Sequence, residues 1–204
     1  MLNDQPVRWW RTVRFGMMAM IFLMGWSSSS FTEQSPMPFA RYSGHPPLLA
    51  VSFDYPEGWR PIESSGSTES YAQVQVLAPL ALGEKPRTYL VVRAMPLKSS
   101  GGRYATVQEA VAAHEASLLP HLHIERRADV QRYGVTVTML DVAGAMQMPF
   151  ERHTPAPVPV KGQRLFFEKD ARVYEVGWLA VTAAADQAAA AFAHLLDTLT
   201  FEPS

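Results

Sequence analysis

Apolar and polar residues alternate along several short stretches of this chain. Between Leu48 and Tyr55 every second residue is apolar or aromatic, which is the period of a β-strand with one buried face. A Pro-Glu-Gly turn then ends the stretch, and Trp59 follows it. Other stretches are rich in β-branched and aromatic residues, which favour strands. The strands predicted from them are Tyr71–Leu77, Tyr89–Met95, Ile124–Val130, Tyr133–Ala143, Gln163–Glu168 and Val173–Val181.

Two segments repeat their apolar residues at helical spacing instead. Thr106 and Glu109 have the spacing of a capping box, in which both side chains accept hydrogen bonds from free backbone N–H groups at a helix start. Pro120 ends this first helix. Its apolar face contains Val107, Ala110, Val111, His114 and Leu118. A second helix is predicted over Ala184–Leu199, with Phe192, Leu195, Leu196 and Leu199 on its buried face.

Proline, glycine and serine mark the connections between these elements. Ala78–Arg87 and Met148–Val160 predict two loops, and they are candidate binding segments because loops on a rigid scaffold often carry contacts. Lys169–Ala171 predicts a tight hairpin between the last two strands. Ser64–Ser67 predicts another hairpin tip, since it lacks the Gly-x-Ser-x-Gly frame of a catalytic serine.

The order of these elements predicts the fold class α+β. Strands outnumber helices and their hairpins are local, which favours an antiparallel β-sheet of about six strands flanked by helices, an α/β/α sandwich. A domain of about 170 residues can bury roughly 70% of its unfolded surface, so one core is enough. That core should include Phe53, Trp59, Val111, Val137, Trp178, Phe192 and Leu196.

Residues 1–30 have the pattern of a sorting signal. Three arginines between positions 8 and 14 precede an apolar run from Phe15 to Trp26, and four serines follow. This pattern describes a secretory signal peptide, and the apolar run is shorter than the ~20 residues that span a bilayer. We predict cleavage near Ser28–Ser30. An uncleaved N-terminal anchor is the alternative, and a helix packed on the domain is a third interpretation.

Composition narrows the classes of function. Residues 31–47 are rich in serine and proline and predict a flexible tether, which leaves 48–204 as the folded domain. The chain has no cysteine, so disulfides, thiolate catalysis and cysteine-based metal sites are excluded. Its 18 Lys and Arg residues nearly balance 19 Asp and Glu residues, and no basic stripe is visible, so no nucleic acid is expected as a partner.

Two stretches carry a resemblance to a known family. The nine residues from Val51 to Trp59, Val-Ser-Phe-Asp-Tyr-Pro-Glu-Gly-Trp, are similar to the opening strand, proline turn and tryptophan of the PsbP family. Arg172–Trp178, the helix after it and Leu199–Pro203 look like the family's last strand, closing helix and tail. The resemblance covers about Leu48 to Pro203. It implies an antiparallel sheet between helices, a fold shared with the Mog-type Ran-binding transport factor.

The resemblance implies less about chemistry. Plant members of the family assist the oxygen-evolving centre of photosystem II and bind calcium or chloride nearby. None of their ion-binding residues can be matched to a position of this chain. The secretory type of leader implies a bacterial, exported relative, and fold-level analogy alone is a weak basis for assigning a function.

Three histidines form the best candidate for a metal site. His121 and His123 are two residues apart, so they point to the same side of an extended segment, and His114 lies one helix length earlier. With Glu115 or Glu125 they could bind zinc, copper or nickel. The residue positions favour a different interpretation, in which His114 is a hydrogen-bonded core residue and the other two lie in a polar turn. No cofactor is predicted.

A pair of carboxylates is another candidate for a metal site, and it is no stronger than the histidines. Asp54 and Glu57 flank the turn before Trp59 and could bind calcium. Carboxylates at such positions more often accept hydrogen bonds from backbone N–H groups of the turn. The aromatic residues Trp59, Trp178, Phe166 and Phe167 are expected in the core rather than as a platform for a ligand.

The sequence leaves two hypotheses of function. The absence of a catalytic motif favours a non-catalytic accessory or binding protein, which assists the assembly or stability of an envelope complex through a protein partner. It would act in the periplasm or at the outer face of the inner membrane, and would contact the membrane only through an uncleaved N-terminal segment. The alternative is a metal-dependent enzyme that uses His114, His121 and His123, which would require the three imidazoles to converge.

Overall fold

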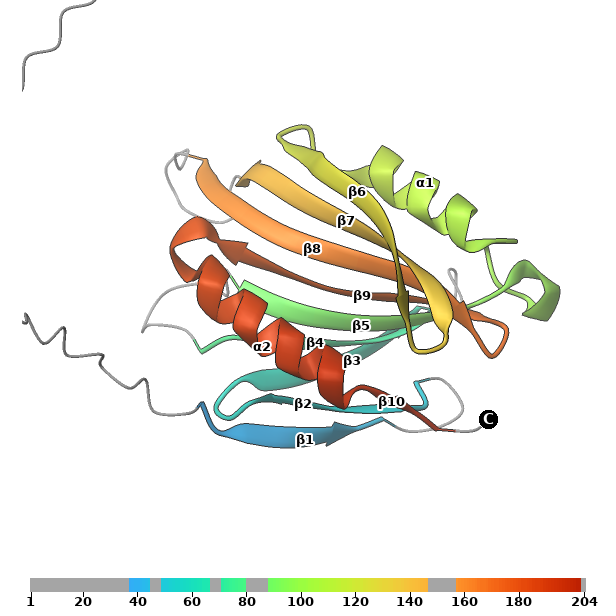
Figure 1. The fold of residues 1–204 in the computed structure, drawn as a ribbon, viewed down its shortest axis with the longest axis horizontal. Coiled ribbons are helices and arrows are strands. Elements are labelled where there is room, and N and C mark those ends of the chain that lie inside the picture. The colour runs from blue at the N-terminus through green and yellow to red at the C-terminus, as the bar shows by residue number, and fades with distance from the viewer. Residues whose placement is uncertain (1–36, 45–48, 67–70, 80–87, 147–156, 203–204) are drawn as a thin grey trace, which may run out of the picture. The chain divides into compact units, whose positions relative to one another are not determined.

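Seven antiparallel strands form the larger sheet of the computed structural model, which describes residues 37–44, 49–66, 71–79, 88–146 and 157–202 (Figure 1). The strand order is β3-β4-β5-β9-β8-β7-β6, so hairpins from the two halves of the chain meet where β5 pairs with β9. The strands are β3 (Arg60–Gly66), β4 (Tyr71–Leu77), β5 (Thr88–Pro96), β6 (Leu122–Arg132), β7 (Val135–Met146), β8 (Val158–Lys169) and β9 (Arg172–Val181).

A smaller sheet has the order β1-β2-β10, and all of its pairs are antiparallel. Its strands are β1 (Phe39–Ser43), β2 (Val51–Pro56) and β10 (Thr200–Phe201). The guanidinium group of Arg41 ties the three strands together, because it donates to Asp54 at 2.9 Å, to Ser52 at 3.1 Å and to Thr200 at 3.3 Å.

Two helices accompany the sheets, α1 (Val107–Ser117) and α2 (Ala185–Thr198), together with the short 3-10 turns η1 (Lys98–Ser100) and η2 (Thr182–Ala184). The predicted cap of α1 is confirmed, since the Thr106 side chain accepts a hydrogen bond from the N–H of Glu109 at 3.2 Å. The Glu109 carboxylate reaches one residue further back than expected and accepts from Ala105 N–H at 2.8 Å. None of the described helices is both long and apolar enough to cross a membrane.

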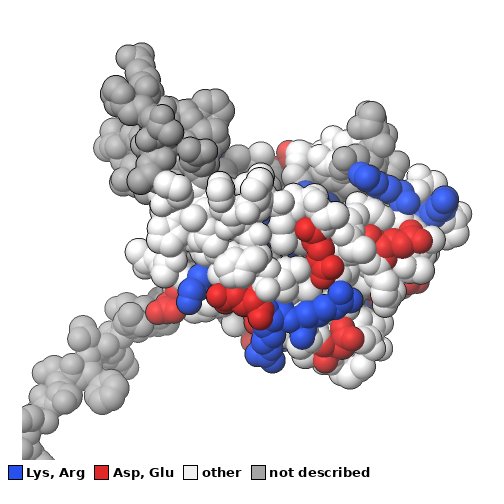
Figure 2. Space-filling model, turned by 90° about the horizontal axis from the view of Figure 1, so that it is seen from above, with Lys and Arg blue, Asp and Glu red and all other residues white. Residues whose placement is uncertain are grey.

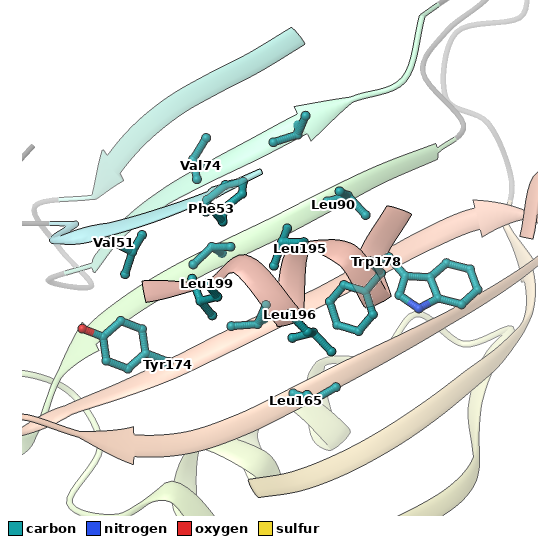
Figure 3. Close-up of a cluster of buried hydrophobic side chains, with 14 of the residues drawn as sticks. Val51, Phe53, Val74, Leu90, Leu165, Tyr174, Trp178, Leu195, Leu196 and Leu199 are labelled. Carbon is teal, nitrogen blue, oxygen red and sulfur yellow. The ribbon is translucent and has the colours of Figure 1, made fainter. Parts of the chain in front are cut away.

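The larger sheet has a different helix on each face. Successive residues of a strand point to opposite faces, so Tyr174, Val176 and Trp178 of β9 belong to one core cluster while Val173 belongs to another. The first cluster contains the buried side of α2 and residues of β2, as Figure 3 shows for Phe53, Leu195 and Leu196. The second cluster is smaller and lies against α1.

All seven residues predicted for the core are buried. Six of them belong to the cluster with α2, whereas Val111 packs in the cluster with α1. Phe166 and Phe167 are also buried, and they point to opposite faces because they are neighbours on β8. The four aromatic residues expected in the core are therefore core residues.

The sheet prediction needs correction. The prediction of about six strands in one sheet is wrong, because the structure has seven strands in one sheet and three in another. The missed β3 is an edge strand that contains Pro61, and most of its residues are exposed. Its side chains therefore lack the apolar period that reveals a half-buried strand. The missed β10 has only two residues.

The predicted tether also needs correction. Residues 39–43, within the predicted segment 31–47, form β1, so the described fold starts before Leu48. Tyr42 is the only buried residue of this strand, and backbone pairing with β2 holds the rest of it. The predicted loop Met148–Val160 likewise ends in β8 from Val158 onward, and Ser64–Gly66 of the predicted hairpin tip belong to β3. Residues 1–36, with the predicted signal or anchor, and most of both predicted loops lie outside the described residues.

Basic and acidic side chains are interspersed on the face seen in Figure 2. This agrees with the near balance of charges in the sequence, 18 basic against 19 acidic residues. Long-range attraction of one sign of charge requires a large single-sign area. The charges that shape the candidate site lie instead beneath the surface, between α1 and the larger sheet.

Candidate functional site

Three charged side chains lie on the α1 face of the larger sheet. Glu175 is in the central strand β9, Arg93 stands directly opposite it on β5, and Arg164 comes from β8 on the other side. One Glu175 oxygen accepts from Arg93 Nη1 at 2.9 Å, and the other lies 3.4 Å from Arg164 Nε. Because the Glu175 side chain is only 7% exposed, its charge requires such partners.

Gly177 makes room for the side chain of Arg164. It stands opposite Arg164 in the pairing of β8 with β9, on the same face as Glu175. A Cβ atom at Gly177 would lie 2.6 Å from Nη1 and 2.7 Å from Cδ of Arg164, closer than real contacts allow. The glycine in the sequence Glu-Val-Gly-Trp therefore lets the guanidinium lie flat over the strand.

Arg164 is buried with only part of its guanidinium satisfied. The residue is 8% exposed. Its Nη2 donates to the hydroxyl of Tyr89 at 2.9 Å, and its carbon Cζ lies 5.5 Å from the centre of the Tyr89 ring. Its Nη1 is buried and has no hydrogen-bond partner. An unsatisfied buried donor costs about 1–3 kcal/mol, and more when charged, so this atom points to a missing acceptor.

His114 approaches the same cluster from α1. Its Nδ1 lies 3.9 Å from a Glu175 oxygen, and its ring packs on Phe166 with 5.2 Å between ring centres. Burial is the largest influence on its pKa and lowers it below the ordinary 6.5; the charges of Arg164 and Arg93 act in the same direction, against Glu175. The ring is therefore neutral near pH 7, and its Nε2 is a second buried atom without a hydrogen-bond partner.

Two pockets open on either side of His114 and Ser117, which line both. The first, called here the Arg164 pocket, has a volume of about 180 Å³ and contains Arg164 and Tyr89. Its apolar lining includes Leu118, Leu119, Leu122, Val142, Met146 and Leu179. The second, called the Arg93 pocket, has about 190 Å³ and is lined by Arg93, Glu175 and Tyr104 among others. The guanidinium of Arg164 thus gives an otherwise apolar pocket one charged wall.

Ser117, His114 and Glu175 are the residue types of a hydrolytic triad, so their geometry matters. A nucleophilic serine must be hydrogen-bonded to its histidine base. Here the Ser117 hydroxyl donates to the backbone carbonyl of His114 at 2.9 Å, and His114 Nε2 has no partner. Glu175 is held by two arginines rather than by the histidine. The serine, histidine and carboxylate are therefore not arranged as a hydrolytic triad.

The predicted histidine cluster is dispersed. His114 faces the sheet, whereas His121 and His123 are exposed. Ile124 packs against the α1 cluster, so its neighbour His123 points to the opposite face of β6. Within the described ranges no group of three or more His, Asp or Glu side chains is placed to hold a metal ion. His114 is half-buried, with 19% of its side chain exposed, and its buried Nε2 has no hydrogen-bond partner, so it is not the hydrogen-bonded core residue of the favoured interpretation.

The predicted carboxylate pair has a structural role. Asp54 accepts from Arg41, one of its oxygens lies 3.6 Å from His194 Nε2, and its backbone N–H donates to Thr198 at 2.9 Å. These contacts join β1, β2 and α2. Glu57 is exposed, and its backbone N–H donates to Pro38 at 2.9 Å.

Sequence reasoning missed Arg93, Arg164 and Glu175. Each is a single charge inside an apolar strand segment, at a position whose neighbours two residues away are apolar on at least one side. A charged residue is almost never fully buried without a partner. A charged residue at an inward position of a predicted strand is therefore the signal that could reveal such a cluster. The sequence does not indicate which strands pair, so it does not show which charges meet.

The fold is similar to that of the solution structure of cyanobacterial PsbP (CyanoP) from Synechocystis sp. PCC 6803. The TM-score is 0.55 at 11% identity, and the match covers 86% of this chain and 99% of that chain. This confirms the PsbP-like fold that the sequence predicted. Such low identity carries the fold alone.

Two other solved structures match with lower scores. PA94 of Pseudomonas aeruginosa, a protein of unknown function, has a TM-score of 0.49 at 16% identity, with 81% of this chain and 99% of that chain covered. LpqN of Mycobacterium tuberculosis, which is involved in cell envelope biogenesis, has a TM-score of 0.48 at 11% identity, with 83% and 93% covered. We base no argument on scores below 0.5. No protein-family model and no curated protein matches the sequence.

Proposed function

We propose that this protein is a non-catalytic binding protein of the cell envelope, and that it binds a small molecule in the Arg164 pocket. The observation that carries the proposal is Arg164, which lines a mainly apolar pocket and whose buried Nη1 has no hydrogen-bond partner. Buried polar atoms in folded proteins are nearly always satisfied. A ligand that supplies an acceptor would satisfy this one.

The wider role that we propose is to assist the assembly or stability of an envelope complex through a protein partner. The support for export is the basic and apolar pattern of residues 1–30, and the support for an accessory role is the fold shared with CyanoP. The second support is an analogy between folds, which by itself assigns no function. The protein would work in the periplasm or at the outer face of the inner membrane.

Native mass spectrometry on protein isolated from the envelope of its source organism tests the binding function. We expect a small molecule bound noncovalently to the full chain, with a mass that stays unchanged on prolonged incubation. Leu118→Trp, which fills the Arg164 pocket, should abolish the bound species. Ala112→Trp adds the same side chain at an exposed position of α1 and should leave it in place.

Three results would contradict this function. They are a protein without any bound species, a bound species that Leu118→Trp does not affect, and a bound molecule that is converted to product. Fractionation of the cells and sequencing of the mature N-terminus test the location separately. An intact Met1 in a cytosolic fraction would contradict export.

The metal-dependent enzyme remains the alternative, and its test is independent of the pocket. Elemental analysis of the purified protein, with melting curves across divalent metals, measures any bound ion. We expect no stoichiometric metal, because His121 and His123 are exposed and His114 faces the sheet. Stoichiometric zinc or copper that is lost in the variant His121→Ala/His123→Ala would support the enzyme instead.

A further inference from the structure

We propose that the ligand of the Arg164 pocket is an aliphatic monocarboxylate, whose carboxylate binds the Arg164 guanidinium and whose tail of about six carbons fills the apolar part. This identification rests on the binding function proposed above. Three properties of the pocket support it: the N–H groups of Arg164 that have no partner, the net positive charge of the three charged side chains, and the volume and lining of the pocket.

The leftover donor belongs to a guanidinium that is otherwise engaged. Nε of Arg164 faces Glu175 at 3.4 Å and one N–H of Nη2 donates to Tyr89 at 2.9 Å, which leaves the two N–H groups of Nη1 and the second one of Nη2. These groups can only donate, so the ligand must present an acceptor. A carboxylate is the acceptor that best matches the planar guanidinium, and charged hydrogen bonds are roughly twice as strong as neutral ones.

The three charged side chains of the site have a net charge of +1. Arg93, Arg164 and Glu175 carry two positive charges and one negative charge, and the 2.9 Å contact pairs Glu175 more closely with Arg93 than with Arg164. His114 adds no charge while it is neutral. One negative charge on the ligand therefore balances the site, whereas a dianion would bring an unpaired charge into it.

The walls favour an aliphatic tail. Seven apolar side chains, Trp178 among them, line the Arg164 pocket, and one of the seven, Leu119, is 51% exposed. The volume of about 180 Å³ is similar to the roughly 150 Å³ of a protein cavity that holds benzene, which sets the tail near six carbons.

The Arg93 pocket on the other side of His114 lacks these properties. Arg93 donates to Gln73 at 2.8 Å and to Glu175 at 2.9 Å, and its Cζ lies 5.2 Å from the centre of the Tyr71 ring. Two of its nitrogens thus have partners within the protein, and Glu175 lines this pocket beside Arg93 and Arg103. The two arginines of one cluster therefore differ in what they can offer a ligand.

Calorimetric titration of the full chain with four six-carbon probes tests the assignment. Hexanoate should bind one to one, whereas hexanol, hexylamine and the dianion adipate should each bind at least about ten times more weakly, as expected when a charged hydrogen bond is lost or a charge is left unpaired. N-acetyl-leucine and its amide form a further pair, which tells whether the C-terminus of a protein could supply the same carboxylate. Equal binding of hexanol and hexanoate, or no hexanoate binding at 10 mM or about that concentration, would overturn the proposal.

Variants of the pocket complete the test. Arg164→Met should weaken hexanoate about ten- to a hundred-fold, because it removes the charged donors while Arg93 still pairs with Glu175. Arg127→Met, the matched control, removes an equal charge at an exposed pair with Glu115 and should leave the affinity within about two-fold. Circular dichroism confirms that each variant is folded.

The variants also separate this inference from the binding function. If hexanoate fails to bind but Leu118→Trp still removes a molecule that accompanies the protein from the envelope, the carboxylate assignment is wrong and the binding function stands. If neither molecule binds, both proposals fail. If hexanoate binds equally well to wild type and Arg164→Met, the pocket recognises only the tail, and the assignment is overturned.

Discussion

The two faces of the larger sheet are built on different principles. The α2 face is a continuous apolar core, in which Phe53, Val74, Leu165 and Leu195 are all buried (Figure 3). The α1 face has a smaller apolar cluster beside three charged residues and two pockets. The same strands supply both faces, because alternate residues of each strand point in opposite directions.

The difference between the faces separates stability from binding. Apolar burial on the α2 face is non-directional, and each fully buried large side chain contributes about 1.5–3 kcal/mol. Buried charges contribute little net stability even when paired. The binding site proposed above therefore lies on the α1 face, the side that contributes less to folding.

Truncation on the α2 face should have the largest effect on stability. Phe192 is 2% exposed on α2, and Phe192→Ala should cost about 3–5 kcal/mol in the free energy of unfolding. In a domain of this size that lowers the melting temperature by roughly ten degrees. Ala193→Ser, at the exposed neighbouring position, is the control. A change near zero for Phe192→Ala would mean that α2 is not packed on this core.

The second largest loss of stability is expected when the Glu175 carboxylate, which both arginines contact, is removed. Glu175→Gln leaves Arg93 and Arg164 facing each other without a counter-charge and should cost about 3 kcal/mol, because Arg164 is buried. Arg164→Met in the same chain should recover part of that loss. Urea unfolding of both single variants and the double variant gives the coupling. Additive losses would show that the two charges do not interact.

Acid should weaken the α1 face more than the α2 face, through His114. Burial lowers the pKa of His114 in the folded protein, so just below pH 6.5 this histidine is protonated in the unfolded chain but stays neutral in the folded protein. Stability therefore falls as the pH drops through 6.5 toward the lower pKa of the folded state. His114→Leu should flatten this dependence between pH 7 and pH 5.5, measured by urea unfolding. Parallel pH profiles of the two proteins would refute it.

The smallest effect is expected at the surface of α1. Arg127 donates to Glu115 at 3.2 Å, and both side chains are well exposed. Arg127→Ala should change the free energy of unfolding by at most about 1 kcal/mol, and raised salt should reduce even that. A loss comparable to that of Glu175→Gln would mean that exposure does not separate the two kinds of ion pair.

The sequence predicts those elements that bury one face or carry a strong local signal. The strand Tyr71–Leu77 is predicted at its observed bounds because apolar and polar residues alternate along all of β4. The start of α1 follows from Thr106 and Glu109, whose side chains act within one turn. In contrast, most residues of β1 and β3 are exposed, and backbone pairing holds these strands in place, which leaves no clear period in the sequence.

The candidate site depends on long-range pairing and is only partly predictable. His114 is recognisable from its place on an apolar helix face. Arg93 and Glu175 meet although they are 82 positions apart, because β5 pairs with β9 in one particular register. Hydrophobic period predicts each of these strands separately, but not which strands become neighbours. The three histidines are close in sequence, but His114 faces the sheet whereas His121 and His123 are exposed.

The same pairing of β5 with β9 constrains how the chain acquires its structure during synthesis. β9 is inserted between β5 and β8, and β10 completes the smaller sheet through residues 148 positions away from their partners on β2. Such non-local contacts slow folding, because a long loop must close before they form. The centre of the larger sheet therefore stays open until β9 has left the ribosome.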